Sequence, residues 1–378
     1  MLRLPAEHDV LATLERVASP PTTPYHEWRA LDAIAAELKR LGLTPRRDAY
    51  GQLSVHVTRG APKRALAFVA HTDHPGFELV TVSGTHGRAR FRGGIDPEYF
   101  RASFPVIIHR DGVAEGHRGT GVDYVHDPVL PDWSAGYCEI RAAQPLAIGD
   151  WAVLDVPAFE RRGNELHLRS ADDLAGCALI LSTLEALADE TRPFSVHAVF
   201  TRAEEPGLFG ARLVAEDGGI PRDTYVVSVE ASNSRHAPAG AGIVVRVGDY
   251  HNTFSNEAER YLRVAQERLA ERGIPTQRRL LPGGTCEASA FVRLGWIATG
   301  IALPNTGYHN AGADGTLVAE MIRVEDLLSG IALSAEAAVA AGADDAESWW
   351  PDVAVVPEEI RERLSRSASI HNRDVSAS

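Results

Sequence analysis

Four short apolar runs, each followed closely by an acidic residue or a histidine, limit what this chain can fold into. The runs lie at residues 65–70, 196–200, 225–229 and 297–303. Unbroken apolar runs of this length are typical of strands buried on both faces, as in a parallel sheet covered by helices. Helical patterns separate the later runs. The chain is therefore predicted to be α/β, with a mixed, mostly parallel sheet flanked by helices.

Helical periodicity fits the segments beside these runs. Gly42 is expected to end the second helix. The helix that opens at Asp172 is predicted to be amphipathic, with its apolar residues on one stripe. The predicted helices cover residues 7–18, 26–41, 172–190, 206–216, 253–272 and 323–341, and a further strand is expected at 52–58.

The sequence pattern changes between residues 76 and 164. Glycines, prolines and short alternating runs replace helical patterns there, with hairpin signals at Asp111-Gly112 and Gly163-Asn164. We interpret this segment as a small β-rich, barrel-like domain inserted into the first. The predicted parts are a discontinuous main domain at 1–75 and 165–345, the insertion at 76–164, and a polar C-terminal tail at 346–378, loose over 365–378.

Composition narrows the function classes. The formal net charge of −13 disfavours binding to nucleic acid and favours the attraction of cations. Three cysteines without C-x-x-C spacing argue against a disulfide framework and against a thiolate zinc site. Because 18 uninterrupted apolar residues occur nowhere, and the first residues lack a long apolar stretch, we expect no membrane partner, no signal peptide and a cytoplasmic protein.

Metal-binding side chains stand where the predicted strands end. The carboxyl ends of strands in an open α/β sheet are where ligands bind, so side chains far apart in sequence can converge there. The pattern predicts metal-dependent chemistry. The candidates are His71, the pair Glu204-Glu205, Glu230 and His309 after the four runs, with the pair Asp172-Asp173 at the start of a helix.

Each of these signals has a simpler structural explanation when it is taken alone. Acidic residues such as Asp172-Asp173 often cap a helix, and a lone histidine such as His71 is more often a core residue. Unpaired carboxylates at Glu204-Glu205 would be costly at the end of a buried strand unless a cation compensates them. Asp73 shares a side with His71 on an extended chain, so its carboxylate is expected to accept the imidazole N–H and fix the tautomer.

The set and its order resemble the tetrahedral aminopeptidases, also called glutamyl or deblocking aminopeptidases, among the co-catalytic di-zinc exopeptidases. The resemblance covers roughly residues 5–340, and the 101 positions from His71 to Asp172 leave room for the extra domain of that family. The segments that carry it are 71–77, 148–150 with 163–164, 171–177, 203–211, 283–285 and 308–309.

The resemblance implies a role for each candidate. Asp172 bridges two metal ions, His71 and Glu230 complete one, Glu205 and His309 complete the other, and Glu204 is the general base. Asp73 is expected as a further catalytic residue because of its predicted contact with His71. Two divalent ions about 3.5–4 Å apart polarise the scissile carbonyl and activate a bridging water, while an unligated carboxylate moves its proton. Histidine and carboxylate ligands without a thiolate favour zinc, with cobalt or manganese as alternatives.

The chain departs from the family's pattern at several positions. The third carboxylate is Glu230 in place of the aspartate common in aminopeptidases, a choice seen more in carboxypeptidase and acylase relatives. The other departures are His74 for an acidic residue, Pro75 for an aliphatic one, Leu174 for an arginine and Cys286 for an aspartate.

We therefore expect a metal-dependent exopeptidase that removes N-terminal residues from peptides. One alternative is an N-acyl amino acid or other amide hydrolase on the same di-metal core. Another is a non-catalytic metal-binding assembly protein, although a binding module would have no need of the unligated Glu204. The expected partners are a peptide or small amide substrate and further copies of the chain.

The resemblance implies a homo-oligomer, as a dimer or as a twelve-subunit shell, built through the inserted domain. Apolar and aromatic residues gather there, and such a surface commonly binds a partner; the alternative is that these residues form the small domain's core. They are Tyr124, Val125, Val129, Leu130, Trp133 and Tyr137.

Overall fold

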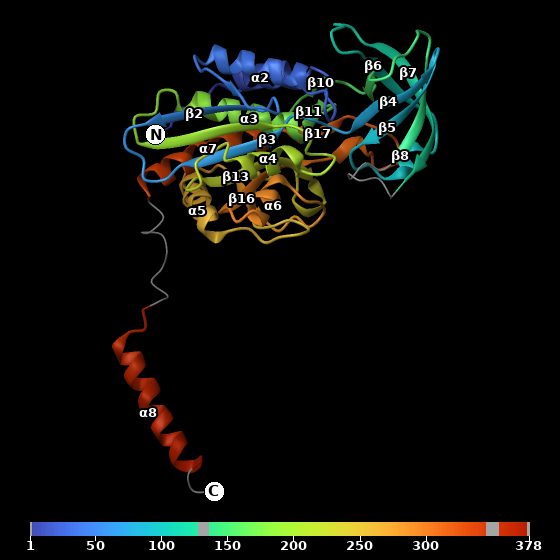
Figure 1. Ribbon diagram of the computed structural model, residues 1–378. Helices are drawn as coiled ribbons and strands as arrows, with labels where there is room; N and C mark the ends of the chain where they lie inside the picture. The colour runs from blue at the N-terminus through green and yellow to red at the C-terminus, as the bar shows by residue number, and fades with distance from the viewer. Residues whose placement is uncertain (1, 128–135, 345–354, 376–378) are drawn as a thin grey trace.

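The computed structural model describes residues 2–127, 136–344 and 355–375. An eight-stranded mixed sheet lies at the centre of the larger part, with helices on both faces, and a closed six-stranded barrel stands at one end (Figure 1). The predicted α/β class, with a mixed sheet flanked by helices and an inserted barrel-like β domain, is confirmed.

The central sheet contains the four apolar runs as neighbouring parallel strands. Its strands are β1 (Arg46–Arg47), β2 (Leu53–Arg59), β3 (Leu66–His71), β12 (Phe194–Thr201), β13 (Tyr225–Asn233), β14 (Ile243–Arg246), β15 (Thr276–Arg279) and β16 (Ala298–Asn305). They lie in the order β1-β2-β12-β3-β13-β16-β14-β15. Because β12, β3, β13 and β16 run parallel, their carboxyl ends meet at one edge.

Helices cover the two faces of this sheet with separate apolar cores. One face packs on α1 (Glu7–Ala18), α2 (Trp28–Arg40), α3 (Ala171–Leu187), α5 (Asn256–Glu271) and α7 (Val324–Ala343), and the other on α4 (Phe209–Asp217) and α6 (Glu287–Arg293). The amphipathic stripe predicted for α3 is wrong. Every residue of α3 except Glu185 is buried, because the helix packs on the sheet and also on α1 and α7.

Helix α7 is also enclosed by the fold. Among the described residues it is the one helix long and apolar enough to cross a membrane by length and composition. However, 89% of its apolar window is buried inside the protein, as is usual for a core helix.

The barrel has its own aromatic core. Its strands are β4 (Gly76–Ser83), β5 (His86–Arg92), β6 (Phe104–His109), β7 (His117–His126), β8 (Gly136–Ala142) and β9 (Trp151–Leu154), and the short helix η1 (Pro97–Phe100) packs against β7. Tyr124 packs against Phe100 in a tilted arrangement, with 4.9 Å between ring centroids, so it joins this core. Val125 is exposed, and Val129, Leu130 and Trp133 lie outside the described residues.

A separate three-stranded sheet follows the barrel. It consists of β10 (Phe159–Arg162), β11 (Glu165–Leu168) and β17 (Glu320–Arg323). The hairpin predicted at Gly163-Asn164 is confirmed, since Arg162 pairs with Glu165 across that turn. The closed barrel thus ends at Leu154, and β10 pairs outside it; the domain boundaries drawn from the sequence remain a prediction.

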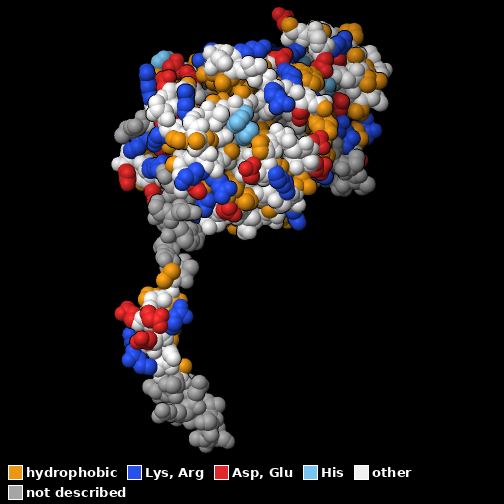
Figure 2. Space-filling view, turned by 60° about the vertical axis from the view of Figure 1, so that its left-hand side comes forward, with side chains coloured by type: hydrophobic (Ala, Val, Ile, Leu, Met, Phe, Trp, Pro, Cys, Tyr) orange, Lys and Arg blue, Asp and Glu red, His pale blue; other side chains and the backbone are white. Residues whose placement is uncertain are grey.

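The tail contains a helix where the sequence predicted a loose segment at 365–378. Helix α8 (Glu358–Val375) stands away from the body (Figure 1). Figure 2 shows acidic and basic side chains close together on its described part. Glu358 and Glu359 in its first turn complement the helix dipole, which favours helix over coil.

Candidate metal centre

The parallel strands and one helix start bring the predicted metal-binding residues together. His71 ends β3, Glu204 and Glu205 follow β12, Glu230 lies in β13, and His309 lies in the short helix η3 (Tyr308–Asn310) after β16. Asp172 comes from the first turn of α3. Two buried clusters result, each with its ligand atoms within 4.8 Å of one another: His71, Glu204 and Glu230, and Asp172, Glu205 and His309.

The carboxylate of Asp172 lies between the two clusters. Its Oδ1 is 3.2 Å from His71 Nε2, and its Oδ2 is 3.3 Å from His309 Nε2. His309 Nε2 is also 3.4 Å from Glu205 Oε1. His71 Nε2 is 3.9 Å from Glu230 Oε2 and 4.0 Å from Glu204 Oε2. One carboxylate therefore offers an oxygen to each of two groups of ligands.

The start of α3 explains why two adjacent aspartates have different roles. The backbone at Asp172 and Asp173 is not helical, although α3 is continuous from there. Asp173 Oδ1 accepts a hydrogen bond from the backbone N–H of Gly176 at 3.2 Å, as a capping residue does. A Cβ at Gly176 would lie 2.3 Å from that oxygen, so glycine is required there. Asp173 caps the helix, and Asp172 faces the clusters.

Asp73 lies beside His71, but its carboxylate does not make the contact expected from the sequence. The atom closest to His71 Nδ1 is the backbone carbonyl oxygen of Asp73 at 3.1 Å, while the carboxylate is 3.6 Å away. The carboxylate instead accepts the backbone N–H groups of Glu204 at 2.9 Å and Glu205 at 3.0 Å. The expectation assumed an extended chain, and β3 ends at His71, so the i, i+2 relation is lost.

Glu320 is a buried residue of the site that the sequence analysis missed. It accepts the backbone N–H of Asp172 at 2.9 Å, the backbone N–H of His309 at 2.7 Å and the side-chain amide of Asn305 at 2.9 Å. It therefore fixes the backbone of one residue from α3 and one from η3. No motif marked it, because it opens β17, which is only four residues long.

Three further contacts orient the imidazoles of His74 and His309 around the clusters. His74 lies 2.6 Å from the carbonyl oxygen of Asp172 through Nδ1 and 2.9 Å from Asn310 Oδ1 through Nε2. Burial lowers the pKa of His74 to about 4. His309 Nδ1 lies 2.6 Å from the carbonyl oxygen of Gly94, which comes from the barrel. That contact leaves His309 Nε2 facing Asp172 and Glu205.

The electrostatics of the centre reflect crowded carboxylates. Burial, together with neighbouring carboxylates, raises the pKa values of Glu204 and Glu205 well above their usual range. Burial alone would lower the pKa of His71, but Glu204 and Asp172 raise it well above its usual value. Burial would raise the pKa of Asp172, but His309 and His71 lower it overall. Buried charges of this kind require compensation by a cation.

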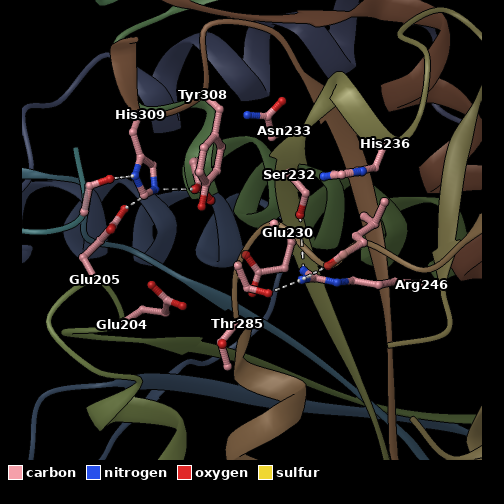
Figure 3. A pocket seen from close by; sticks show the side chains of 15 residues that line it. Glu204, Glu205, Glu230, Ser232, Asn233, His236, Arg246, Thr285, Tyr308 and His309 are labelled. Carbon is pink, nitrogen blue, oxygen red and sulfur yellow. Dashed lines mark hydrogen bonds and ion pairs between the residues drawn. The ribbon is translucent and has the colours of Figure 1, made fainter. Parts of the chain in front are cut away.

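The donor atoms fit a pair of divalent cations. Glu205 Oε1 is buried and accepts no hydrogen bond from any residue in the described part of the chain. The two clusters present imidazole nitrogens and carboxylate oxygens without a thiolate, which suits zinc, cobalt or manganese. One side of the centre opens into a cavity of about 210 Å³ (Figure 3).

The wall of this cavity away from the clusters carries several polar side chains. It is formed by the end of β13, by the short helix η2 (Ser234–His236), by β14 and by the segment that includes Gly283, Gly284 and Thr285. Figure 3 shows Arg246 and His236 on this wall, with His309 and Glu205 at the other end of the cavity. The side chain of Tyr308 lies between the two ends.

Comparison with known proteins agrees with this architecture. Residues 51–329 match the family model of the M42 glutamyl aminopeptidases. The fold is similar to that of aminopeptidase APDkam598 from the archaeon Desulfurococcus kamchatkensis, with a TM-score of 0.74 and 20% identity over 92% of this chain and 99% of that one. It is also similar to the TET1 peptidase of Pyrococcus horikoshii, with a TM-score of 0.70 and 21% identity over 87% and 99% of the two chains.

Proposed function

Because the chain belongs to the M42 glutamyl aminopeptidase family, a family of metal-dependent exopeptidases, we propose that it removes amino-terminal residues from peptides at a centre of two divalent ions. The observation that carries the proposal is the position of the Asp172 carboxylate, with one oxygen facing each of two histidines. Such a bridge is what a co-catalytic pair of ions needs.

The proposed division of the ligands between the two ions follows the family's pattern, and the two clusters are compatible with it. His71 and Glu230 would hold one ion, Glu205 and His309 the other, and Asp172 both. Zinc is the proposed metal, with cobalt or manganese as alternatives, since the donor set accepts all three. Bound divalent ions would polarise the scissile carbonyl and lower the pKa of the attacking water.

Glu204 is proposed as the general base. Its carboxylate is 8% exposed and lines the cavity, so it can reach both a substrate and a water there. Glu204 and Glu230 lie at nearly equal distances from His71 Nε2, 4.0 Å and 3.9 Å, so the choice of Glu204 as the base follows the family's pattern. Glu204 would take a proton from the attacking water and donate it to the leaving amine. Asp73 would position Glu204 through the hydrogen bond to its backbone N–H.

A panel of matched substrates tests this function. The protein, loaded with zinc or with cobalt, is given one peptide with a free amino terminus and the same peptide with an acetylated one. We expect the free peptide to lose residues singly from its amino end, as followed by mass spectrometry, and the acetylated peptide to survive. Hydrolysis of N-acyl amino acids without cleavage of free peptides would assign the centre to the amide-hydrolase alternative.

Assembly and location complete the proposal. The Pyrococcus horikoshii TET1 peptidase is described as able to assemble into a tetrahedron or a large octahedral shell. We propose that this chain also forms a homo-oligomer, at least a dimer. A cytoplasmic location is part of the proposal, and the net charge of −13 disfavours a nucleic-acid partner.

A further inference from the structure

A buried carboxylate lies behind the pair Glu204-Glu205, outside the cavity. It belongs to Glu27, which comes just before α2 and is fully buried. Its Oε1 accepts the backbone N–H of Ala203 at 3.1 Å, and its Oε2 accepts a hydrogen bond from Nε of Arg202 at 2.8 Å. Glu27 therefore holds the two residues that connect β12 to the acidic pair.

The backbone that Glu27 holds is strained. Ala203 has a φ of 51° and Tyr25 a φ of 74°, in the left-handed region that residues other than glycine rarely adopt. Both residues donate their backbone N–H to Glu27 Oε1, Tyr25 at 2.9 Å. Because such a conformation persists only where surrounding contacts enforce it, one carboxylate oxygen supports both strained residues.

Buried carboxylates accept three successive backbone N–H groups at this turn. Glu27 accepts that of Ala203. Asp73 accepts that of Glu204 at 2.9 Å and that of Glu205 at 3.0 Å. These hydrogen bonds fix the turn of the chain after β12, and with it the directions in which the two glutamate side chains leave the backbone. Glu204 faces one cluster and Glu205 the other.

Arg202 balances the charge of Glu27 and anchors it. Its Nη2 lies 2.8 Å from Glu27 Oε2 and donates to the carbonyl oxygen of Tyr25 at 3.1 Å. Its Nη1 donates to the carbonyl oxygen of Tyr50 at 2.6 Å, and the guanidinium lies 4.2 Å from the centroid of the Trp28 ring. Removal of one partner would leave the other charge unpaired, which is costly in a buried site.

The connection between α1 and α2 that contains Glu27 also supports the loop after β3. The hydroxyl of Thr22 in this connection donates to the carbonyl oxygen of Thr72 at 2.6 Å, next to His71. One short segment thus contacts the backbone of both loops that follow the strands β3 and β12. Neither of its contacts involves the side chain of a predicted metal ligand.

We propose that Glu27, paired with Arg202, is a positioning residue that holds Glu204 in place for proton transfer and Glu205 in place for metal binding. The inference rests on the proposed exopeptidase function. A misplacement of about 1 Å at a reacting group can cost about 10²-fold in rate. Loss of a partner behind a metal ligand typically costs about 10–100-fold in metal affinity or activity.

A purely structural Glu27 would behave differently. Breaking a buried ion pair lowers the stability of the fold, but it leaves the rate of the molecules that remain folded unchanged. Glu37 provides the matched control, because it is also a buried glutamate of this region and pairs with Arg16 in α1 and Arg40 in α2. Glu37→Gln should therefore lower stability and keep the wild-type kcat.

The experiment compares the zinc-loaded wild type with Glu27→Gln, Arg202→Met, their double variant and Glu37→Gln, with kcat corrected for the folded fraction from circular dichroism. On a peptide with a free amino terminus, we expect Glu27→Gln to lower kcat about 10–100-fold and to leave KM within about threefold of wild type. Chelator competition should show one zinc equivalent bound about 10–100-fold less tightly in Glu27→Gln. The double variant should lose no more kcat than the more impaired single variant, because both residues act through one contact.

Any one of three results would overturn the proposal: a folded Glu27→Gln with the kcat of Glu37→Gln, unchanged affinity for both zinc equivalents, or losses in kcat that multiply in the double variant. If Glu27→Gln does not fold, Arg202→Met decides, and a wild-type kcat in that variant counts against positioning. These results in an active wild type refute only this inference. A zinc-loaded wild type that cleaves no peptide with a free amine refutes the proposed function itself.

Discussion

At the residue scale, the centre depends on adjacent acidic residues that do different things. In Asp172-Asp173 the second residue caps a helix and the first faces two histidines. In Glu204-Glu205 both backbone N–H groups bind Asp73, so the two side chains are held side by side while they face different clusters. This division suggests variants that separate proton transfer from metal binding.

Glu204→Gln should abolish turnover and leave metal binding nearly intact. The amide keeps the size of the side chain but cannot take a proton, and general-base catalysis contributes about 10²–10⁴-fold to rate. Steady-state kinetics and metal analysis on the same preparation check this, with the surface variant Glu15→Gln as a control. Wild-type rates in Glu204→Gln would move the base elsewhere, to Glu205 or Asp173.

Asp172→Asn should show the opposite behaviour. Because one oxygen of this carboxylate faces each histidine, the variant is expected to lose affinity for both ions together. Competition with a chromogenic chelator measures the two affinities. Loss of one ion with full retention of the other would show that Asp172 does not bridge.

Glu320→Gln tests a residue that touches neither substrate nor metal. Its carboxylate accepts the backbone N–H groups of Asp172 and His309, and an amide cannot accept both with the same geometry. Removal of such a partner behind metal ligands typically costs about 10–100-fold in metal affinity. We expect a loss of this size in chelator competition. Glu165→Gln, at a half-exposed position of the neighbouring strand, is the control, and equal affinities in the two variants would refute a positioning role.

At the scale of elements, the parallel strands explain how residues far apart in sequence converge. The carboxyl ends of β3, β12, β13 and β16 lie at one edge, and each is followed by, or ends with, a ligand. The barrel contacts the larger part of the molecule near this edge. His26, just before α2, meets Glu78 in β4 and Asp111 in the turn after β6, and its ring stacks on Trp151 in β9.

This contact should make the stability of the protein depend on pH. Burial would lower the pKa of His26, but Glu78 and Asp111 raise it above 6.5 overall. A raised pKa in the folded state means that charged His26 stabilises fully below its unfolded pKa of about 6.5, and that this contribution is lost as pH rises through the folded value.

The comparison of wild type with His26→Gln isolates that contribution. The difference in free energy of unfolding, from urea titrations, should be larger at pH 6 than at pH 9. The residual difference at pH 9 reports the stacking on Trp151. A difference independent of pH would show that His26 is not charged in the folded protein.

Strong, long patterns in the sequence were sufficient to predict the central elements. The strands β3, β12, β13 and β16 and helices α1, α2, α5 and α7 lie where periodicity placed them, because each is long enough to show its burial pattern. β14, β15 and β17 have four residues each and no such pattern. Arg246 and Glu320 lie in these short strands, so their places in the site became visible only in the structure.

The local path of the backbone also limited what could be predicted from the sequence. Asp73 was expected to contact His71 through its carboxylate, and the end of β3 turned the carbonyl towards the ring instead. α3 was expected to be amphipathic, but it is buried on all its faces. The periodicity of its own sequence does not show which other elements will cover it. Both differences arise from tertiary contacts that the sequence alone does not specify.

At the scale of the whole molecule, the barrel contributes to the centre as well as to the surface. The carbonyl oxygen of Gly94 binds His309, and the hydroxyl of Tyr99 donates to the carbonyl oxygen of Gly312 at 2.9 Å. The segment that precedes and includes η1 therefore closes one side of the site.

Light scattering tests the proposed homo-oligomer. We expect the intact protein to be at least a dimer at micromolar concentration and a variant with residues 121–137 shortened to dissociate. A monomeric intact protein would end the proposal. An unchanged oligomer in the shortened variant would move the interface away from that segment of the barrel.

The central claim is that two clusters sharing Asp172 hold two ions that serve peptide hydrolysis. Its most direct test is a titration with zinc or cobalt of protein from which a chelator has removed the metal. Calorimetry measures the binding, and hydrolysis of a peptide with a free amino terminus measures the activity. The account predicts saturation at two equivalents per chain, with activity that depends on loading. Saturation at one equivalent, or full activity in the chelated protein, would contradict it.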